Sequence, residues 1–135
     1  MIALGSKGGK QETGKRAADL LSGKIILVVE DEFLLALQLE ELVESLGGRV
    51  RGPYRSLDRA MEARREDFDL AILDINLGGA MVYPLADDLA ERGVPFIFLS
   101  GYSGANLPER FRSVTRLSKP CDPDALIAVL QSHLP

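Results

Sequence analysis

The chain has 135 residues, of which 46% are hydrophobic and 27% are charged, and these values are typical of one globular domain. Its single cysteine, Cys121, excludes an intrachain disulfide and a cysteine-based zinc site, and it fits a reducing compartment. No apolar run approaches the roughly 20 residues of a membrane span, and the N-terminus lacks the apolar core of a signal peptide. We therefore expect a cytoplasmic protein with no membrane contact.

Charge is distributed unevenly along the chain, whose formal net charge is −4 at pH 7. The first 24 residues hold five basic and two acidic side chains, so the remainder holds 11 basic and 18 acidic ones, a net charge of −7. Nucleic-acid binding requires a clustered positive surface, so we expect no direct nucleic-acid partner. Residues 1–23, rich in Gly, Lys and Ser, predict a flexible N-terminal extension, and residues 24–135 predict one folded domain.

From residue 24 onward, short apolar runs alternate with segments of helical periodicity. Residues 25–29 (IILVV) are typical of a strand that is buried on both faces of a parallel sheet. In residues 32–46, leucines recur at helical spacing before Gly47 and Gly48, which predicts a helix with a glycine stop. The remaining strands are expected at residues 49–53, 70–73, 95–99 and 114–117, and the remaining helices at residues 57–65, 82–91, 105–111 and 123–133.

Five strand–helix units are too few for an eight-stranded barrel, so they predict an α/β fold with an open, doubly wound parallel sheet. The fourth helix is expected to be short, because Pro108 lies inside its pattern. In sheets of this kind the functional site lies outside the carboxyl ends of the strands, where the strand order reverses.

Polar side chains stand at the ends of four predicted strands. They are Glu30 and Asp31, Asp74, Ser100 and Lys119. A single carboxylate in such a place is commonly a solvated strand end or a helix N-cap. Three converging carboxylates repel one another, so they are best tolerated with a divalent cation between them. The all-oxygen ligand set and an open cleft favour Mg²⁺.

With Mg²⁺ bound, these residues predict phosphoryl transfer onto the protein itself. Asp74 would attack a phosphoryl donor as a carboxylate nucleophile and form an acyl phosphate. Ser100 would donate a hydrogen bond to one phosphoryl oxygen, and Lys119 would pair with another. Gly78 and Gly79 are interpreted as a loose turn beside the site.

Four short motifs resemble the receiver domain of bacterial two-component response regulators, the CheY-like family. They are VVEDE at residues 28–32, LDINL around Asp74, FLSGY at residues 98–102 and LSKP around Lys119. The resemblance covers residues 24–134 and implies a flavodoxin-like (βα)₅ fold with a five-stranded sheet in the order 2-1-3-4-5. It also implies that a histidine kinase or a histidine phosphotransfer protein phosphorylates Asp74.

The same resemblance implies a ligand set for the metal. Asp31, Asp74 and the backbone carbonyl group of Asn76 would hold Mg²⁺, and Glu30 would assist through water. The peptide bond between Lys119 and Pro120 would be cis, as in the family.

The sequence departs from most receivers at Arg116, where the family usually has an aromatic residue that turns inward on phosphorylation. The FLSGY motif is instead similar to the FATGUY subgroup of single-domain receivers from alphaproteobacteria, whose fifth strand also lacks that aromatic. This subgroup is associated with HWE-type kinases and general stress signalling. Tyr102 either covers the phosphoryl pocket, gates the segment that follows it, or packs as a half-buried aromatic.

Two surfaces beside the site could bind a partner. Phe33, Leu34 and Leu37 lie outside the face of the first helix that is predicted to pack on the core. They therefore predict a docking surface for kinase or phosphotransfer helices. The alternative is a contact with the N-terminal extension or with neighbouring loops. Arg110, Arg112 and Arg116 form either a solvated face or a recognition patch.

The expected function is a stand-alone response regulator that accepts a phosphoryl group on Asp74 and signals or relays it through protein contacts. We expect a monomer or weak dimer, and no enzyme activity beyond its own phosphorylation and dephosphorylation. One alternative is a phosphorylation-independent adaptor with the same fold. Another is a small phosphohydrolase with Asp74 as nucleophile, although Asn76 stands where haloacid-dehalogenase-like enzymes carry a second acid.

Overall fold

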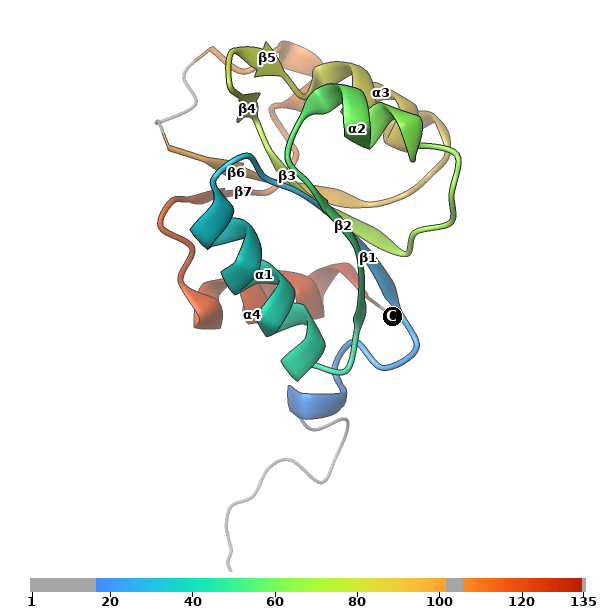
Figure 1. Cartoon of the computed structure of the whole chain (residues 1–135), viewed down its shortest axis with the longest axis vertical. Coiled ribbons are helices and arrows are strands. Elements are labelled where there is room, and N and C mark those ends of the chain that lie inside the picture. Colours follow the sequence, from blue (N-terminus) through green and yellow to red (C-terminus); the bar gives the residue numbers. More distant parts are fainter. Residues whose placement is uncertain (1–16, 102–105, 135) are drawn as a thin grey trace, which may run out of the picture.

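The computed structural model describes residues 17–101 and 106–134, which form a parallel sheet with helices on both faces (Figure 1). The five strands of this sheet lie in the order β2-β1-β3-β6-β7. Their bounds are Ile25–Val29 for β1, Arg49–Tyr54 for β2, Leu70–Asp74 for β3, Phe96–Ser100 for β6 and Arg116–Ser118 for β7. Counted along the chain, this order is 2-1-3-4-5, so the predicted doubly wound sheet is confirmed.

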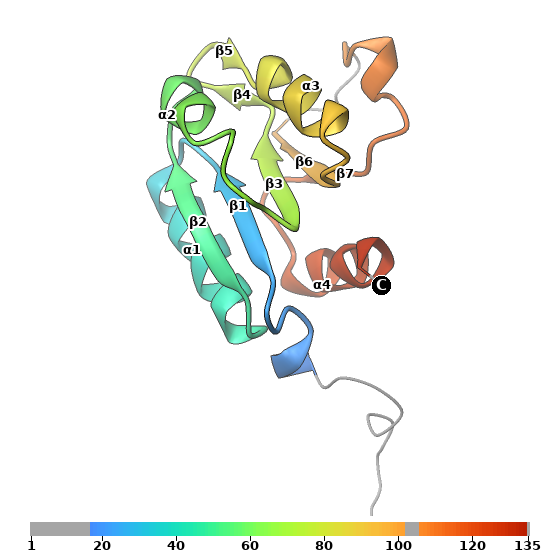
Figure 2. The ribbon, with the colours of Figure 1, turned by 90° about the vertical axis from the view of Figure 1, so that its right-hand side faces the viewer.

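Helices cover both faces of the sheet, as Figures 1 and 2 show. α1 (Phe33–Ser45) and α4 (Pro123–His133) lie on one face, and α2 (Leu57–Glu62) and α3 (Tyr83–Glu91) lie on the other. Successive side chains of a strand point to opposite faces, so β1 contributes to two separate cores. Its Ile26 packs in the cluster with α1 and α4, and its Leu27 packs in the cluster with α2 and α3.

Three elements differ from the sequence prediction. α2 ends at Glu62, three residues earlier than expected, and the last strand is shifted to Arg116–Ser118. The expected helix at 105–111 is a single 3₁₀ turn, Glu109–Phe111, and the structure does not describe residues 102–105. Pro108 stands directly before this turn, and proline cannot donate the backbone hydrogen bond that a longer helix would need there.

The folded body begins before the expected boundary at residue 24. A 3₁₀ turn, Ala17–Asp19, leads into Leu21, whose side chain is fully buried against the core on the α1 side. The Leu21 N–H donates to the carbonyl oxygen of Leu46 across an N–O distance of 2.8 Å. A Cβ atom on Gly48 would lie 2.9 Å from the Cβ of Leu21, so these two segments are in close contact. This contact was not predicted, because Leu20 and Leu21 end a pattern that stops at Gly23 and is too short to indicate what it packs against.

Candidate functional site

The sheet brings the predicted polar residues together at its carboxyl edge. Glu30 and Asp31 follow β1, Asp74 ends β3, Ser100 ends β6, and Lys119 follows β7. The strands are in parallel register, with Asp74 opposite Leu99 and Ser100 opposite Ser118, so the strand ends lie side by side. An open cleft of about 780 Å³ lies above them, and its lining includes Asp31, Asp74, Ser100 and Lys119.

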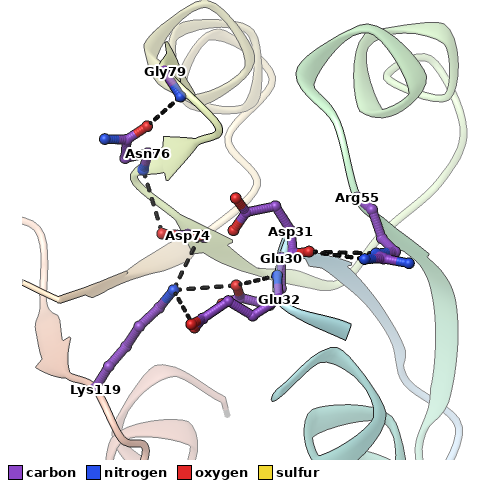
Figure 3. Close-up of polar contacts among 8 residues, drawn as sticks. All are labelled: Glu30, Asp31, Glu32, Arg55, Asp74, Asn76, Gly79 and Lys119. Atoms are coloured by element: carbon purple, nitrogen blue, oxygen red, sulfur yellow. Dashed lines mark hydrogen bonds and ion pairs between the residues drawn. The ribbon is translucent and has the colours of Figure 1, made fainter. Parts of the chain in front are cut away.

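Lys119 contacts several of the acidic side chains in this cleft (Figure 3). Its Nζ lies 3.1 Å from each of three carboxylate oxygens, which are Glu30 Oε2, Glu32 Oε1 and Asp74 Oδ2. The Lys119 side chain is 16% exposed, and the side chains of Glu30 and Asp74 are 0% and 4% exposed. One ammonium group therefore neutralises part of a largely buried acidic cluster.

Burial opposes ionisation of two carboxyl groups of this cluster, those of Asp74 and Glu30. Burial is the main cause that raises the pKa of Asp74 to about 8, followed by the neighbouring carboxyl groups of Asp31 and Glu30. Burial also raises the pKa of Glu30, although Lys119 opposes that shift. Burial by itself would raise the pKa of Asp31 as well. The contacts of Asp31 with Asp74 and Glu30 and the charge of Lys119 outweigh burial, so the pKa of Asp31 is lowered.

The acidic cluster fits a divalent cation. Glu30, Asp31 and Asp74 each offer an oxygen atom, and these three atoms lie within 4.8 Å of one another. Glu30 Oε1 is buried and accepts no hydrogen bond from any described residue, whereas Oε2 accepts from the Glu32 N–H and from Lys119. A buried oxygen without a donor is costly, and a cation or its bound water would satisfy it. An all-oxygen set of this kind suits Mg²⁺.

The segment after Asp74 is more ordered than the loose turn expected from the sequence. β4 (Asn76–Leu77) pairs antiparallel with β5 (Ala80–Met81), and Gly78 and Gly79 form the tip of this hairpin with φ angles of 66° and 101°. The Asn76 side-chain oxygen accepts from the Gly79 N–H at 2.7 Å. The Asn76 N–H donates to Asp74 Oδ1 at 3.3 Å, so the hairpin also orients the Asp74 carboxyl group.

The other predicted site residues have different positions. Phe33, Leu34 and Leu37 are exposed on α1, at 63%, 65% and 38%, so the second apolar face is present at the surface. Arg116 is exposed on β7. Tyr102 lies outside the described residues. The peptide bond between Lys119 and Pro120 is cis, as the resemblance implied.

Two residues near the site had not been singled out from the sequence. Glu32 follows the acidic pair directly, and its carboxylate reaches Lys119. Arg55, 24 residues beyond Asp31, donates from Nη2 to the Asp31 carbonyl oxygen at 3.1 Å, and its guanidinium lies 5.4 Å from the centre of the Phe33 ring. Proximity to the acidic pair was a usable signal for Glu32, whereas nothing in the sequence marks Arg55.

Comparison with known proteins agrees with this geometry. The model of the response regulator receiver domain family matches residues 26–131. The phyllosphere-induced regulator PhyR of Methylorubrum extorquens is 34% identical over 134 residues, which cover 91% of this chain and 48% of PhyR. The chain therefore spans about half the length of this curated relative.

Solved structures of similar proteins have the same fold as this chain. SdrG from Sphingomonas melonis Fr1 has a TM-score of 0.72 and 36% identity, with 86% of this chain and 98% of SdrG covered. The receiver domain of PhyR from Erythrobacter litoralis has a TM-score of 0.72 and 29% identity, with 83% and 90% covered. No described helix is both long enough and apolar enough to cross a bilayer. From the family match and the fold, this chain belongs to the response regulator receiver domain family.

Proposed function

We propose that this chain is a phosphoacceptor receiver that takes a phosphoryl group onto Asp74 from a histidine kinase or a histidine phosphotransfer protein. The observation that carries the proposal is the position of the Asp74 carboxyl group. It lies in an open cleft, 3.1 Å from the Lys119 ammonium and within an acidic cluster that fits Mg²⁺. Family membership supports the same reaction class.

In the proposed reaction, an Asp74 oxygen attacks the phosphorus atom of a phosphohistidine. A P–O bond forms, the P–N bond breaks, and the imidazole leaves with the electron pair of that bond. Asp74 must be ionised to attack, and its burial raises its pKa, which opposes ionisation when no metal ion is bound. Bound Mg²⁺ would favour the ionised carboxylate and offset charge on the transferring group. Lys119 would pair with one phosphoryl oxygen, and Ser100 would donate to another.

We propose that Asp31, Asp74 and the Asn76 carbonyl group hold the Mg²⁺, with Glu30 acting through water. The donor would dock on the exposed apolar face formed by Phe33, Leu34 and Leu37, at the end of α1 nearest the cleft. From the resemblance of the FLSGY motif to the FATGUY subgroup, we further propose general stress signalling in the cytoplasm, with an HWE-type kinase as the donor. Output would pass through protein contacts.

Intact-mass measurement after incubation with acetyl phosphate tests the proposal. Wild-type protein should gain one phosphoryl group with Mg²⁺ and none with EDTA, and Asp74→Asn should gain none in either case. Asp67→Asn, at an exposed aspartate before β3, is the matched control and should behave as wild type. Labelling of Asp74→Asn at the wild-type rate would contradict the assignment. Wild type that stays unlabelled with both acetyl phosphate and a phosphorylated kinase would favour the adaptor function.

A further inference from the structure

The carboxylate of Glu32 shares Lys119 with two buried carboxylates, although Glu32 itself is at the surface. Its Oε1 lies 3.1 Å from Lys119 Nζ, and its side chain is 63% exposed. On the basis of the proposed phosphoacceptor function, we propose that Glu32 is a positioning residue that holds Lys119 in the resting protein. It competes with the incoming phosphoryl group for that ammonium, and so acts as a brake on phosphorylation of Asp74.

The first step of the argument is a count of donors. A lysine ammonium has three N–H groups and no acceptor. In this structure the three are matched by three carboxylate oxygens, one each from Glu30, Glu32 and Asp74. A phosphoryl oxygen can therefore pair fully with Lys119 only if one of these carboxylates gives up its contact.

Burial decides which carboxylate leaves. Glu30 is fully buried, so separating it from Lys119 would leave a charge without solvent, which is expensive. Asp74 is the acceptor itself and is 4% exposed. Glu32 is by far the most exposed of the three, and exposed ion pairs contribute little stability. Release of Glu32 is therefore the exchange that costs least.

The backbone around Glu32 allows this exchange without a change of fold. The Glu32 N–H donates to Glu30 Oε2 at 2.9 Å, and the Glu32 carbonyl oxygen accepts from the Ala36 N–H at 2.9 Å in the first turn of α1. Both contacts hold the main chain and leave the side chain free to rotate away from the cleft. Only the Glu32 carboxylate has to move when a phosphoryl oxygen takes its place.

The brake is the contact of Glu32 with Lys119, which must be broken before a phosphoryl oxygen can take its place. Replacing Glu32 with glutamine removes this ionic contact. The resulting acceleration should be about threefold, which corresponds to about 0.7 kcal/mol and lies within the range measured for exposed ion pairs.

The test compares the rates at which acetyl phosphate and Mg²⁺ label four variants, followed by intact mass. Glu32→Gln should be labelled about threefold faster than wild type. Glu44→Gln, which removes the same charge from an exposed position on α1, should match wild type. Adding Glu32→Gln to Lys119→Ala should change the rate of Lys119→Ala by much less than threefold, because Glu32 acts through Lys119.

A second readout needs neither metal nor phosphoryl donor. In EDTA, Glu32→Gln should lower the melting temperature of the protein that retains Lys119 by about 1–3 °C more than it lowers the melting temperature of the Lys119→Ala variant. This difference reports the resting contact directly.

The outcomes separate the brake from the underlying function. Equal rates for wild type and Glu32→Gln overturn the brake alone. An acceleration that persists undiminished in Lys119→Ala also overturns it, because the charge of Glu32 would then act without Lys119. A wild type that shows no labelling with either acetyl phosphate or a phosphorylated kinase overturns the proposed function, and the brake with it.

Discussion

Lys119 and Asp74 are 45 residues apart in the sequence, yet Lys119 Nζ lies 3.1 Å from Asp74 Oδ2 at a place where both side chains are largely withdrawn from water. Two parallel strands, β3 and β7, deliver them to the same edge of the sheet with β6 between them. The ammonium group compensates the buried acidic cluster in the resting protein. The same group is positioned to pair with a phosphoryl oxygen, so stability and the proposed chemistry depend on one contact.

Removal of Lys119 should destabilise the metal-free protein. Lys119→Met leaves Glu30 and Asp74 buried without a cation, and breaking a buried pair on one side costs about 3 kcal/mol. Urea denaturation in EDTA at pH 7 measures this loss, and Mg²⁺ should recover part of it. Lys24→Met, near the opposite end of β1, is the control and should change stability by less than about 0.5 kcal/mol. Equal losses in the two variants would contradict the role of Lys119 as the compensating charge.

Stability should fall with rising pH when no metal is bound. The pKa of Asp74 is about 8 in the folded protein against an ordinary value of 3.8, so the folded state holds one more proton than the unfolded state between these values. The stabilising contribution of Asp74 to the free energy of unfolding is fully present below about pH 4. It falls as the pH rises to about 8, and it does not change further above that pH. The slope from this group is at most about 1.4 kcal/mol per pH unit.

Denaturation of wild type and Asp74→Asn in EDTA from pH 5 to pH 9 measures this effect. Asp74→Asn should flatten the slope and should be more stable than wild type at pH 9, because asparagine has no charge to bury. Mg²⁺ should flatten the wild-type slope as well. If stability changes with pH to the same extent in the two proteins, Asp74 is not the group that causes the pH dependence.

Arg55 should restrain the loop that carries Asp31. Its guanidinium donates to the Asp31 carbonyl oxygen and lies over the Phe33 ring, so it ties the β1–α1 loop to the end of β2. Arg55→Gln should speed hydrogen exchange of the amides at residues 31–34 about fivefold, the effect of losing about 1 kcal/mol of local stability. Arg59→Gln, at an exposed position on α2, should leave exchange in this loop unchanged.

Leu21 should be part of the folded domain. Leu21→Ala removes a fully buried side chain and should cost about 3 kcal/mol in urea denaturation. Leu37→Ala, on the exposed face of α1, should cost less than about 1 kcal/mol. A chain that starts at residue 24 should show a loss similar to that of Leu21→Ala. If it is as stable as a chain that starts at residue 17, the contact of Leu21 with Leu46 contributes nothing.

Much of the architecture could be predicted from local patterns. The apolar run at residues 25–29 and the leucine periodicity of α1 correspond to elements that the structure contains with nearly the same bounds. Strand ends were also predictable, and with them the meeting of Glu30, Asp31, Asp74 and Lys119, because parallel strands carry their carboxyl ends to one edge. The hairpin β4–β5 was missed, since two-residue strands leave no alternation to detect.

The sequence by itself determined which residues could form the acidic cluster and which strands would carry them, because hydrophobicity and its periodicity are local properties of the chain. Only the tertiary structure decided how the ammonium of Lys119 is shared, that Glu32 reaches it, and that Arg55 holds the Asp31 loop. Those contacts join residues that are 24 to 89 positions apart and depend on where side chains meet in space. The buried surroundings that raise the pKa of Asp74 likewise exist only once the strands are packed together.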